Sequence, residues 1–571
     1  MGDTHHKEDD LKRISRREFL KKAGLAAGVA AAGSITLLNA CSSSTITSIV
    51  TKTITTALPD SKTGTKSPSA THSSTTTSSA TQTTSPATTT SATSTTATPT
   101  TATATTTAQT VAEKAFPGTV ILGRPENHAV TLNLLTNADC EYYVEYGKNT
   151  GIYDGKTNPS SLKQSVPLEI SLTGLDANAS YAYRIRHREP GGTDYYAGAT
   201  SAYHTQRAKN ESFIFTIEAD PHWDEKTDLD KTKLTFKNIL NAKPDFNIDL
   251  GDTPFLDKLT YLGTTLASKT PSTYEAVSAI SIDRRGYFDI FARSVPLYLV
   301  LGNHDGEQAY NLNGTENNMA IWATEARKLY YPNPSPDSFY TGDVTAEPFV
   351  GLREGYYAWE WGDALFVVLD PYWYTKAVKS IATGWDWTLG KAQYTWLKTT
   401  LAKSEAKFKF VFSHNLVGGF DPSLNKNIPA GSGNGRGGSE AAHFYEWGGQ
   451  NTDGSPGFDQ NRPGWGKPIH QLLVDNHVSI FFHGHDHFFG KQELDGVTYQ
   501  ECPQPGSMSS SNHASEYGYT DGIFLGSSGY MRITVTGTSA TVDYVMTYLP
   551  GEETATQKNG GVAYSYSIKN S

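Results

Sequence analysis

Five short segments of this chain carry side chains that can bind metal ions, and each segment follows an apolar run typical of a β-strand. Their carboxylates, imidazoles and one amide are the oxygen and nitrogen donors that divalent transition metals accept. Any one segment alone would more often be a turn or a buried core histidine, but five in succession favour a metal site. The segments are Asp220-Pro221-His222, Gly251-Asp252, Gly302-Asn303-His304-Asp305, His414 and Gly484-His485-Asp486-His487.

The apolar runs that precede these segments indicate where the donors meet. In an open α/β sheet, ligands bind beyond the carboxyl ends of the strands, and that is where each segment would lie. The five runs therefore predict one shared site at a sheet edge, which points to an enzyme. They cover residues 213–217, 246–250, 295–301, 408–412 and 478–482.

The order of these motifs, D-x-H, G-D, G-N-H-D, H and G-H-x-H, resembles that of the calcineurin-like metallophosphoesterase superfamily. The resemblance covers roughly residues 213–545. It implies a phosphoric ester hydrolase with a dinuclear metal site and an α/β/β/α sandwich fold. The implied ligands are Asp220, His222 and His487 for one metal, Asn303, His414 and His485 for the other, and Asp252 as the bridge between them.

Chemistry gives an independent reason for this set of residues. An anionic phosphate ester repels hydroxide, and two cations about 3.5–4 Å apart neutralise the phosphoryl oxygens and acidify a bound water. A bridging carboxylate such as Asp252 sets that spacing. The leaving alkoxide also needs a proton, which a histidine that titrates near neutrality can supply. We therefore expect attack by a metal-bound hydroxide, with His304, at the position of the family's catalytic histidine, as the proton donor and Asp305 orienting it.

We expect two divalent transition-metal ions, Mn, Zn or Fe, because the site departs from that of the purple acid phosphatases. Those relatives carry a tyrosine ligand three residues after the bridging aspartate, and a glycine at the position of His222. This chain has Phe255 where the tyrosine would be, and a phenyl ring cannot coordinate a metal. Without a phenolate ligand, we expect less preference for ferric iron and none of the colour of tyrosinate bound to iron.

The first 40 residues are predicted to be a targeting signal rather than part of a folded domain. Arg16-Arg17 precedes an apolar stretch rich in Gly and Ala over residues 23–38, shorter than the roughly 20 residues that a membrane-spanning helix needs. This pattern resembles a twin-arginine export signal. Leu38-Asn39-Ala40-Cys41 resembles a bacterial lipobox, with Asn39 as a departure from it. We expect an extracytoplasmic protein, either a lipoprotein anchored to the membrane through Cys41 or a freely secreted one.

A linker and a β domain follow. Residues 41–114 are mostly Ser, Thr, Ala and Pro, so they cannot bury enough apolar surface to fold, and we predict a disordered linker. Residues 115–207 contain short alternating runs separated by turn residues, the pattern of an all-β sandwich. The spacing from Leu175 to Tyr181 matches the tyrosine corner of fibronectin type III domains. A similar domain precedes the catalytic domain of purple acid phosphatases, and we predict a scaffold or docking role for it.

The catalytic domain is predicted to span residues 208–548, with a C-terminal tail over residues 549–571. Two folded domains are expected because a single core seldom grows beyond about 250–300 residues. Apolar residues between 229 and 240 fit one helical face between two predicted strands, which makes a βαβ unit. A second helix is predicted around residues 393–401. The predicted fold class is therefore α/β: a metallophosphoesterase sandwich preceded by an all-β fibronectin type III-like sandwich.

Two long connections are expected to shape the substrate pocket, because long loops in compact domains are usually functional or disordered. They cover residues 252–294 and 418–467. Arg436, His443 and Arg462 in the second connection are candidates for contacts to phosphate, and the alternative for each is a solvated surface group. We assign none of them a catalytic role.

Charge and cysteine content limit the partners. The formal net charge is −10, and removal of residues 1–40 takes away seven basic and five acidic residues, which leaves −12. Such a chain does not attract polyanions, so nucleic acid is not expected as the main substrate. Cys140 and Cys502 belong to separate predicted domains, and no disulfide is expected between them.

Three functions remain open from the sequence. The first is an exported phosphatase for small-molecule phosphate monoesters, and the second is a phosphodiesterase or nucleotide-cleaving enzyme that uses the same metals. The third is a surface binding module with a vestigial metal site, against which the complete ligand set argues. The pocket decides between the first two, and the sequence does not indicate an oligomeric state.

Overall fold

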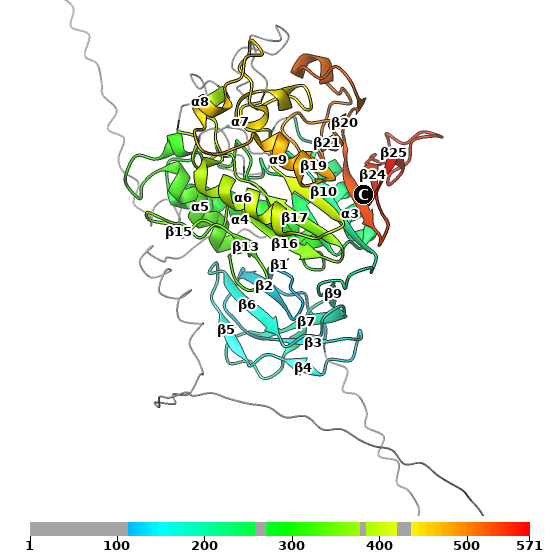
Figure 1. Cartoon of the computed structure of the whole chain (residues 1–571). Coiled ribbons are helices and arrows are strands. Elements are labelled where there is room, and N and C mark those ends of the chain that lie inside the picture. Colours follow the sequence, from blue (N-terminus) through cyan, green and yellow to red (C-terminus); the bar gives the residue numbers. More distant parts are fainter. Residues whose placement is uncertain are drawn as a thin grey trace, which may run out of the picture. The chain divides into compact units, whose positions relative to one another are not determined.

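The computed structural model describes residues 112–224, 226–254, 256, 270–376, 384–419 and 435–570. The predicted export signal, Cys41 and nearly all of the predicted linker lie outside these residues, as does Phe255. In Figure 1, the described chain begins with a small all-β sandwich, coloured blue to teal, and continues into a larger α/β part, coloured green to red.

The sandwich consists of two antiparallel sheets whose apolar side chains meet in one core. Tyr181 forms the predicted tyrosine corner, because its hydroxyl accepts a hydrogen bond from the N–H of Asp176 at 2.9 Å. The first sheet contains β1 (Gly118–Gly123), β2 (Ala129–Thr136) and β6 (Leu168–Thr173). The second contains β3 (Cys140–Gly147), β4 (Gly155–Lys156), β5 (Ser160–Leu162), β7 (Ser180–Arg188), β8 (Tyr196–Ala197) and β9 (Ser201–His204).

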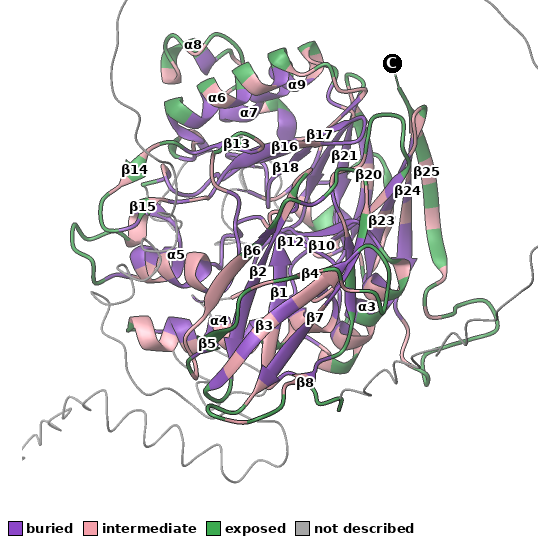
Figure 2. Ribbon diagram, turned by 90° about the horizontal axis from the view of Figure 1, so that it is seen from below, coloured by how far each residue is buried: buried purple, intermediate pink, exposed green. Residues whose placement is uncertain are grey.

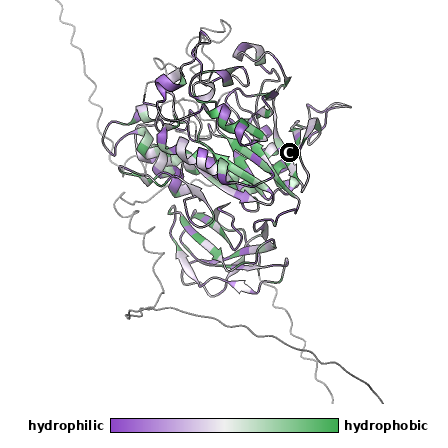
Figure 3. Ribbon diagram, viewed as in Figure 1, coloured by the Kyte–Doolittle hydropathy of each residue, from purple (hydrophilic) through white to green (hydrophobic). Residues whose placement is uncertain are grey.

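The larger part is built around two sheets with a shared core. Phe215 from one sheet contacts Phe410 and Phe482 from the other, with ring centroids 5.5 and 6.3 Å apart, and hydrophobic strands fill the centre of Figure 3. The first sheet, in spatial order, contains β12 (Leu297–Leu299), β11 (Phe246–Asp249), β10 (Phe213–Glu218), β23 (Gly529–Val535), β24 (Ser539–Met546) and β25 (Val562–Lys569). The second contains β13 (Thr341–Gly342), β16 (Tyr357–Trp361), β17 (Ala364–Val368), β18 (Phe408–Phe412), β19 (Ile480–His483), β21 (Val497–Glu501), β20 (Phe489–Leu494) and β22 (Ile523–Leu525). A separate hairpin joins β14 (Ala346–Glu347) and β15 (Gly351–Leu352).

Helices cover the outer face of each sheet (Figure 2). Apolar side chains from three helices pack with Leu297 and Tyr530 on the first sheet, and those from three others pack with Val411 and Phe481 on the second. The predicted α/β/β/α sandwich is therefore confirmed. The first three helices are α3 (Leu229–Ala242), α4 (Tyr274–Ala292) and α5 (Met319–Tyr330), and the others are α6 (Gly390–Lys403), α7 (Tyr445–Gly448) and α9 (Ile469–Asp475). Shorter helical segments are η1 (Ala309–Asn311), η2 (Gly384–Asp386), η3 (Ala441–His443), α8 (Phe458–Asn461) and η4 (Ala514–Tyr517).

The unit β10–α3–β11 shows how the sequence positions the site. β10 and β11 run parallel, with Phe215 paired to Phe246, and α3 connects them as predicted. The helix begins where the side chain of Asp228 accepts hydrogen bonds from two backbone N–H groups of the first turn. Since parallel strands end at the same edge, the segments that follow β10 and β11 lie next to each other.

Part of the connection over residues 252–294 is not the loop that the sequence predicts, because the 19 residues Tyr274–Ala292 form helix α4, capped by the hydroxyl of Thr273. The sequence pattern hides this helix, since part of its buried face is polar. Arg285 is fully buried and donates hydrogen bonds to backbone carbonyls of β1 and β2. The described portion of residues 418–467 is also partly helical, with η3, α7 and α8.

Residues 562–569 belong to a sheet rather than to the tail predicted for residues 549–571. They form β25, which pairs antiparallel with β24. Tyr564, Tyr566 and Ile568 pack against the core between the sheets, and the hydroxyl of Tyr566 donates a hydrogen bond to the side chain of Gln500 at 2.8 Å. The alternation of large and small residues in this segment is a strand pattern, and it explains the pairing.

In the described ranges, no helix combines the length and apolarity needed to cross a membrane. Cys140 and Cys502 are both buried and unpaired, the first in the core of the β-sandwich and the second in the core between the two larger sheets.

Candidate metal centre

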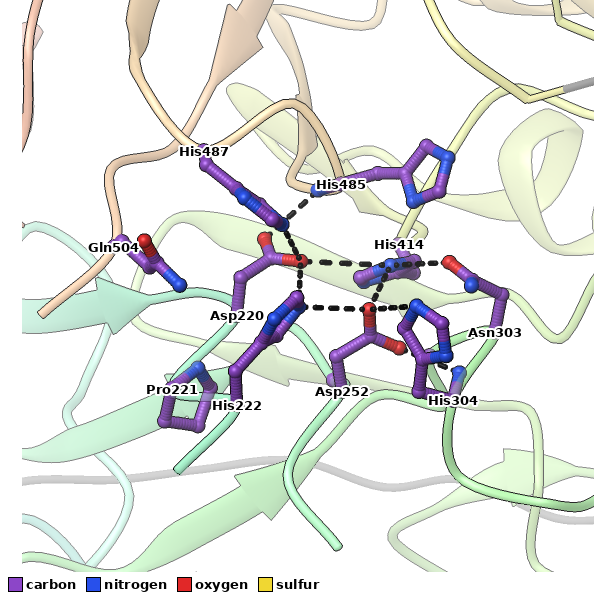
Figure 4. A network of polar contacts seen from close by, with 12 residues as sticks. Asp220, Pro221, His222, Asp252, Asn303, His304, His414, His485, His487 and Gln504 are labelled. Atoms are coloured by element: carbon purple, nitrogen blue, oxygen red, sulfur yellow. Dashed lines mark hydrogen bonds and ion pairs between the residues drawn. The ribbon is translucent and has the colours of Figure 1, made fainter. Parts of the chain in front are cut away.

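The five predicted segments meet beyond the carboxyl ends of five strands (Figure 4). Parallel pairing puts the ends of β10, β11 and β12 at one edge of the first sheet and the ends of β18 and β19 at one edge of the second, and the two edges meet at the site (Figure 4). The backbone ladder stops there, and the side chains of the following residues turn toward one another. Asp220 and His222 follow β10, Asp252 follows β11, Asn303 and His304 follow β12, His414 follows β18, and His485 and His487 follow β19.

Asp220, His222 and His487 form one group of potential ligands, as the resemblance implies. Nε2 of His222 lies 3.5 Å from Oδ1 of Asp220, and Nε2 of His487 lies 3.4 Å from the same oxygen. This oxygen is buried and has no hydrogen-bond partner among the described residues. Two imidazoles thus face an unsatisfied carboxylate oxygen, an arrangement that a cation would satisfy.

Asn303, His414 and His485 lie in a second group. Nε2 of His414 is 3.1 Å from Oδ1 of Asn303, and the ring centroids of His414 and His485 are 5.2 Å apart. Together with Asp252, the two histidines offer donor atoms close enough to share one cation. Nδ1 of His414 lies 2.8 Å from the carbonyl oxygen of Leu250, which leaves Nε2 for the site.

Asp252 stands between the two groups. Its Oδ2 lies 3.2 Å from Nε2 of His222 and 3.2 Å from Nε2 of His414. One carboxylate oxygen therefore contacts an imidazole from each group, which is the placement that a bridging ligand needs. Its Oδ1 accepts a hydrogen bond from the backbone N–H of His304 at 2.7 Å.

His304 lies next to Asp252, where the sequence predicts the proton donor. Its Nε2 is 3.9 Å from Oδ2 of Asp252, and its ring centroid is 5.6 Å from that of His222. The residue is 5% exposed. A buried imidazole beside the bridging carboxylate can hold or give a proton there. His222, Asp252 and His304 also form a third possible ligand group, so metal analysis is needed to separate the two roles.

Asp305 does not have the predicted role of orienting the His304 ring. Its Oδ2 accepts hydrogen bonds from the N–H groups of Gly302 at 2.7 Å and Asp252 at 3.1 Å. Its Oδ1 has no hydrogen-bond partner among the described residues. The carboxylate therefore ties the turn after β12 to the turn after β11, and it positions Asp252 and His304 through their backbone.

The backbone at the potential ligands is strained. Asp220, His222, Asp252, His485 and His487 all have positive φ values, between 52° and 78°, a region that residues with a Cβ rarely adopt. Such conformations cost of order 1–3 kcal/mol each and persist only where the surrounding structure holds them. The concentration of these strained conformations at the potential ligands indicates that the fold directs the ligand side chains toward one point.

The pKa values show how strongly the carboxylates and imidazoles interact. Burial lowers the pKa of His414, but Asp252 and Asp220 raise it to about 9. Burial also lowers the pKa of His222, but the carboxylates of Asp220, Asp224 and Asp252 around it hold it well above its usual value. The carboxylates thus favour positive charge at this point, and metal cations can supply that charge in place of protons.

Two further carboxylates lie behind the ligands. Glu218 and Asp249 are fully buried at the ends of β10 and β11, and burial raises the pKa of Asp249 to about 7. Both oxygens of Glu218 lack a hydrogen-bond partner among the described residues. A cation at the centre would stabilise the ionised form of these buried carboxyl groups. The donor types, their burial and the surrounding charge all fit two divalent transition metals.

Of the three loop candidates, Arg436 lies at the centre. Its Nη1 donates hydrogen bonds to the carboxylate of Asp486 at 2.6 Å and to the carbonyl of His485 at 3.2 Å. Arg462 is instead held in an ion pair with a glutamate of α7, and His443 is exposed. Arg436 therefore supports the turn that carries two of the potential ligands.

Residues outside the predicted motifs complete the surroundings of His487. The hydroxyl of Ser527 donates a hydrogen bond to the carbonyl of His487 at 2.9 Å and accepts one from the N–H of Gln504 at 3.0 Å. Figure 4 places the side chain of Gln504 beside Asp220 and His487. No motif marks these positions in the sequence, because strand pairing brings them to the site: Gln504 follows β21, which pairs with β19, and Ser527 precedes β23, which pairs with β10.

The α/β/β/α core thus gathers seven residues with nitrogen and oxygen donors at its strand ends, where they could hold metal ions. Residues 214–489 match the family model described as calcineurin-like phosphoesterase. This part of the chain is a calcineurin-like metallophosphoesterase domain, the domain of a phosphoesterase hydrolase.

The solved structures that resemble this chain include the following two. The structure of PhoD matches with a TM-score of 0.55 and 14% sequence identity, over 80% of this chain and 91% of that chain. Purple acid phosphatase PPD1 from seeds of yellow lupin (Lupinus luteus) matches with a TM-score of 0.49 and 13% identity, over 79% of this chain and 74% of that chain. At such identity, the likeness to PhoD supports the fold alone. No curated protein matches the chain.

Proposed function

We propose that this chain is an exported phosphatase that hydrolyses small phosphate monoesters with two divalent transition-metal ions at the candidate metal centre. The family match supports phosphoester hydrolysis. The observation that carries the proposal is the position of Asp252, one oxygen of which lies 3.2 Å from an imidazole of each ligand group. Export is supported by the Arg16-Arg17 segment of the sequence.

The two ligand groups would hold the cations as the resemblance implies. When bound, such cations neutralise charge on the phosphoryl oxygens and make water acidic enough to attack near neutral pH. The chain contributes the spacing, because Asp252 is fixed by the backbone N–H of His304 and by the carboxylate of Asp305. The holding residues are Asp220, His222 and His487 for one ion, Asn303, His414 and His485 for the other, and Asp252 for both.

His304 would give the proton that the leaving alkoxide needs. Its Nε2 faces the bridging carboxylate at 3.9 Å, while its backbone N–H is bonded to the other oxygen of that carboxylate. The ring is therefore held at a fixed distance from the carboxylate of Asp252. Because the residue is buried, water competes little with the leaving group for this proton.

The site opens on the side of His487. The side chains of Asp220, Asp252 and His414 are at most 1% exposed, whereas that of His487 is 31% exposed. A phosphate ester would therefore enter past His487 and meet the deeper ligands away from bulk water. Gln504 lies on the same side, next to His487.

Turnover of p-nitrophenyl phosphate and of bis(p-nitrophenyl) phosphate by the Mn-loaded protein tests the proposal. We expect a higher kcat/KM for the monoester. A higher kcat/KM for the diester would replace the monoesterase by a phosphodiesterase on the same site. If neither ester is hydrolysed although metal is bound, the chain is a binding module rather than an enzyme.

A further inference from the structure

The turn Gly484-His485-Asp486-His487 contributes one histidine to each ligand group. His485 and His487 have φ values of 78° and 66°, so the chain here has left the extended form of β19. Its backbone N–H groups cannot continue the sheet ladder. Buried N–H groups without a partner are costly, so the turn needs acceptors from elsewhere in the fold.

Glu501 supplies two of these acceptor contacts. Its Oε1 lies 3.0 Å from the backbone nitrogen of Asp486 and 3.1 Å from that of His487, and both N–H groups donate to it. Its Oε2 lies 2.7 Å from Nδ1 of His483. Glu501 is fully buried and ends β21, in parallel register with His483 at the end of β19. Its carboxylate therefore sits directly under the turn.

The third N–H group of the turn donates a hydrogen bond to a different carboxylate. The backbone N–H of His485 donates to Oδ2 of Asp220 at 2.8 Å. Asp220 itself belongs to the first ligand group, so its position depends on the metal that it would hold. Glu501 belongs to none of the possible ligand groups in the described residues, so it can hold the turn whether or not metal is bound.

We propose that Glu501 is a positioning residue that fixes the separation of His485 and His487, and through them the separation of the two metal ions. The inference rests on the proposed function in so far as two ions bind. One oxygen that accepts from two adjacent backbone N–H groups suits a group that must hold a strained turn. Its reach from β21 matters more than its charge, because the contacts are made by one oxygen to two adjacent backbone N–H groups.

Two substitutions at Glu501 separate the effect of side-chain length from the effect of charge. Glu501→Gln keeps the length of the side chain and an acceptor oxygen but loses the charge. Glu501→Asp keeps the charge but is one methylene shorter, so its oxygen cannot reach both N–H groups from the same backbone position. Thr498→Val is the matched control, a similarly sized change at a buried residue on the same strand.

Mn(II) titration followed by calorimetry, together with electron paramagnetic resonance of the Mn-loaded protein, gives readouts that do not depend on turnover. We expect Glu501→Asp to weaken binding of one of the two ions by about 10–100-fold, the usual effect of losing a group that supports metal ligands. Its resonance spectrum should show altered coupling between the ions. Glu501→Gln and Thr498→Val should remain close to the wild type in both measurements.

Other outcomes overturn the inference. If Glu501→Asp binds both ions with wild-type affinity and an unchanged spectrum, Glu501 does not set their separation. If Glu501→Gln is more impaired than Glu501→Asp, the residue acts through its charge and not through the turn. A wild-type protein that binds fewer than two ions would overturn the proposed function and, with it, this inference. Wild-type behaviour of Glu501→Asp in a protein that binds two ions would overturn the inference alone.

Discussion

Each of the two central histidines is held by a second group, which decides the ring nitrogen that faces the metal site. Nδ1 of His414 lies against the carbonyl of Leu250 at 2.8 Å, and Nδ1 of His222 lies 3.7 Å from a carboxylate oxygen of Asp224. Asp224 is in turn fixed by the N–H of Lys226 at 2.9 Å. Nε2 of both rings is thereby directed at Asp252, and supporting groups of this kind also make the ligands more basic.

Replacement of His304 by alanine tests whether this residue gives a proton or binds a metal. As a general acid it can be removed without loss of metal, and kcat for an alkyl phosphate should fall by about 10²–10⁴. The fall should be smaller for nitrophenyl phosphate, whose leaving group needs no proton. Rates on both esters and the metal content are measured on one preparation. Equal falls would argue against the role, and loss of metal would make His304 a ligand together with His222 and Asp252.

Iron-loaded protein should be pale. Near the centre, Tyr372 donates a hydrogen bond to the side chain of Asn415, and burial raises its pKa well above the usual value, which disfavours the tyrosinate form. Phe255, at the position predicted for a tyrosine ligand, lies outside the described residues and has no oxygen to offer. The visible spectrum of the ferric protein is the measurement. A strong charge-transfer band would show that a tyrosinate binds the iron and that His222 does not replace it.

Residue type and spacing were enough to predict which side chains the fold brings together, because each lies in a short motif directly after a strand. The supporting residues could not be found in this way. Asp305, Glu501 and Gln504 act on backbone or hydroxyl groups of neighbouring turns, and those contacts depend on which strands pair. The role of Asp305 was wrongly predicted for this reason. Its position next to His304 in the sequence suggested a contact with the His304 ring, but in the fold its carboxylate accepts a hydrogen bond from the N–H of Asp252.

At the scale of elements, α3 and α4 both cover the first sheet, but the apolar pattern of the sequence predicts only α3. α3 was predicted because Phe236 and Ile239 form part of an apolar face. α4 was missed because it buries Arg284 and Arg285 along with its apolar side chains. A buried arginine resembles a surface residue in sequence, and the carbonyl groups that satisfy Arg285 come from the β-sandwich.

The last strand is expected to stabilise the domain. A chain that ends at residue 560 lacks β25, which exposes the edge of β24 and the core side of Tyr544, and it should melt at a lower temperature and aggregate more readily. A milder variant, Tyr566→Phe, removes the hydrogen bond to Gln500 and should cost about 1 kcal/mol of unfolding free energy. Tyr564→Phe on the same strand is the control. Melting at the full-length temperature after truncation would mean that the segment contributes nothing to the fold.

At the scale of the whole molecule, the described residues form a catalytic head that follows a predicted export signal and linker. Substitution of both Arg16 and Arg17 by lysine should keep the protein in the cytoplasm, because the paired arginines are the feature that resembles a twin-arginine signal. Cys41→Ser should move the head from the membrane fraction to the soluble extracytoplasmic fraction. Fractionation with metabolic labelling by fatty acid measures both effects. Unlabelled wild-type protein in the soluble fraction would instead indicate free secretion.

Metal content is the most direct test of a dinuclear centre. Elemental analysis of the purified wild-type protein after reconstitution should give about two transition-metal ions per chain, since the donors form two groups around Asp252. The Asp252→Ala variant should lose both ions or nearly all turnover, because this carboxylate contacts an imidazole of each group. One ion or fewer per chain in a fully active wild-type protein would contradict the account.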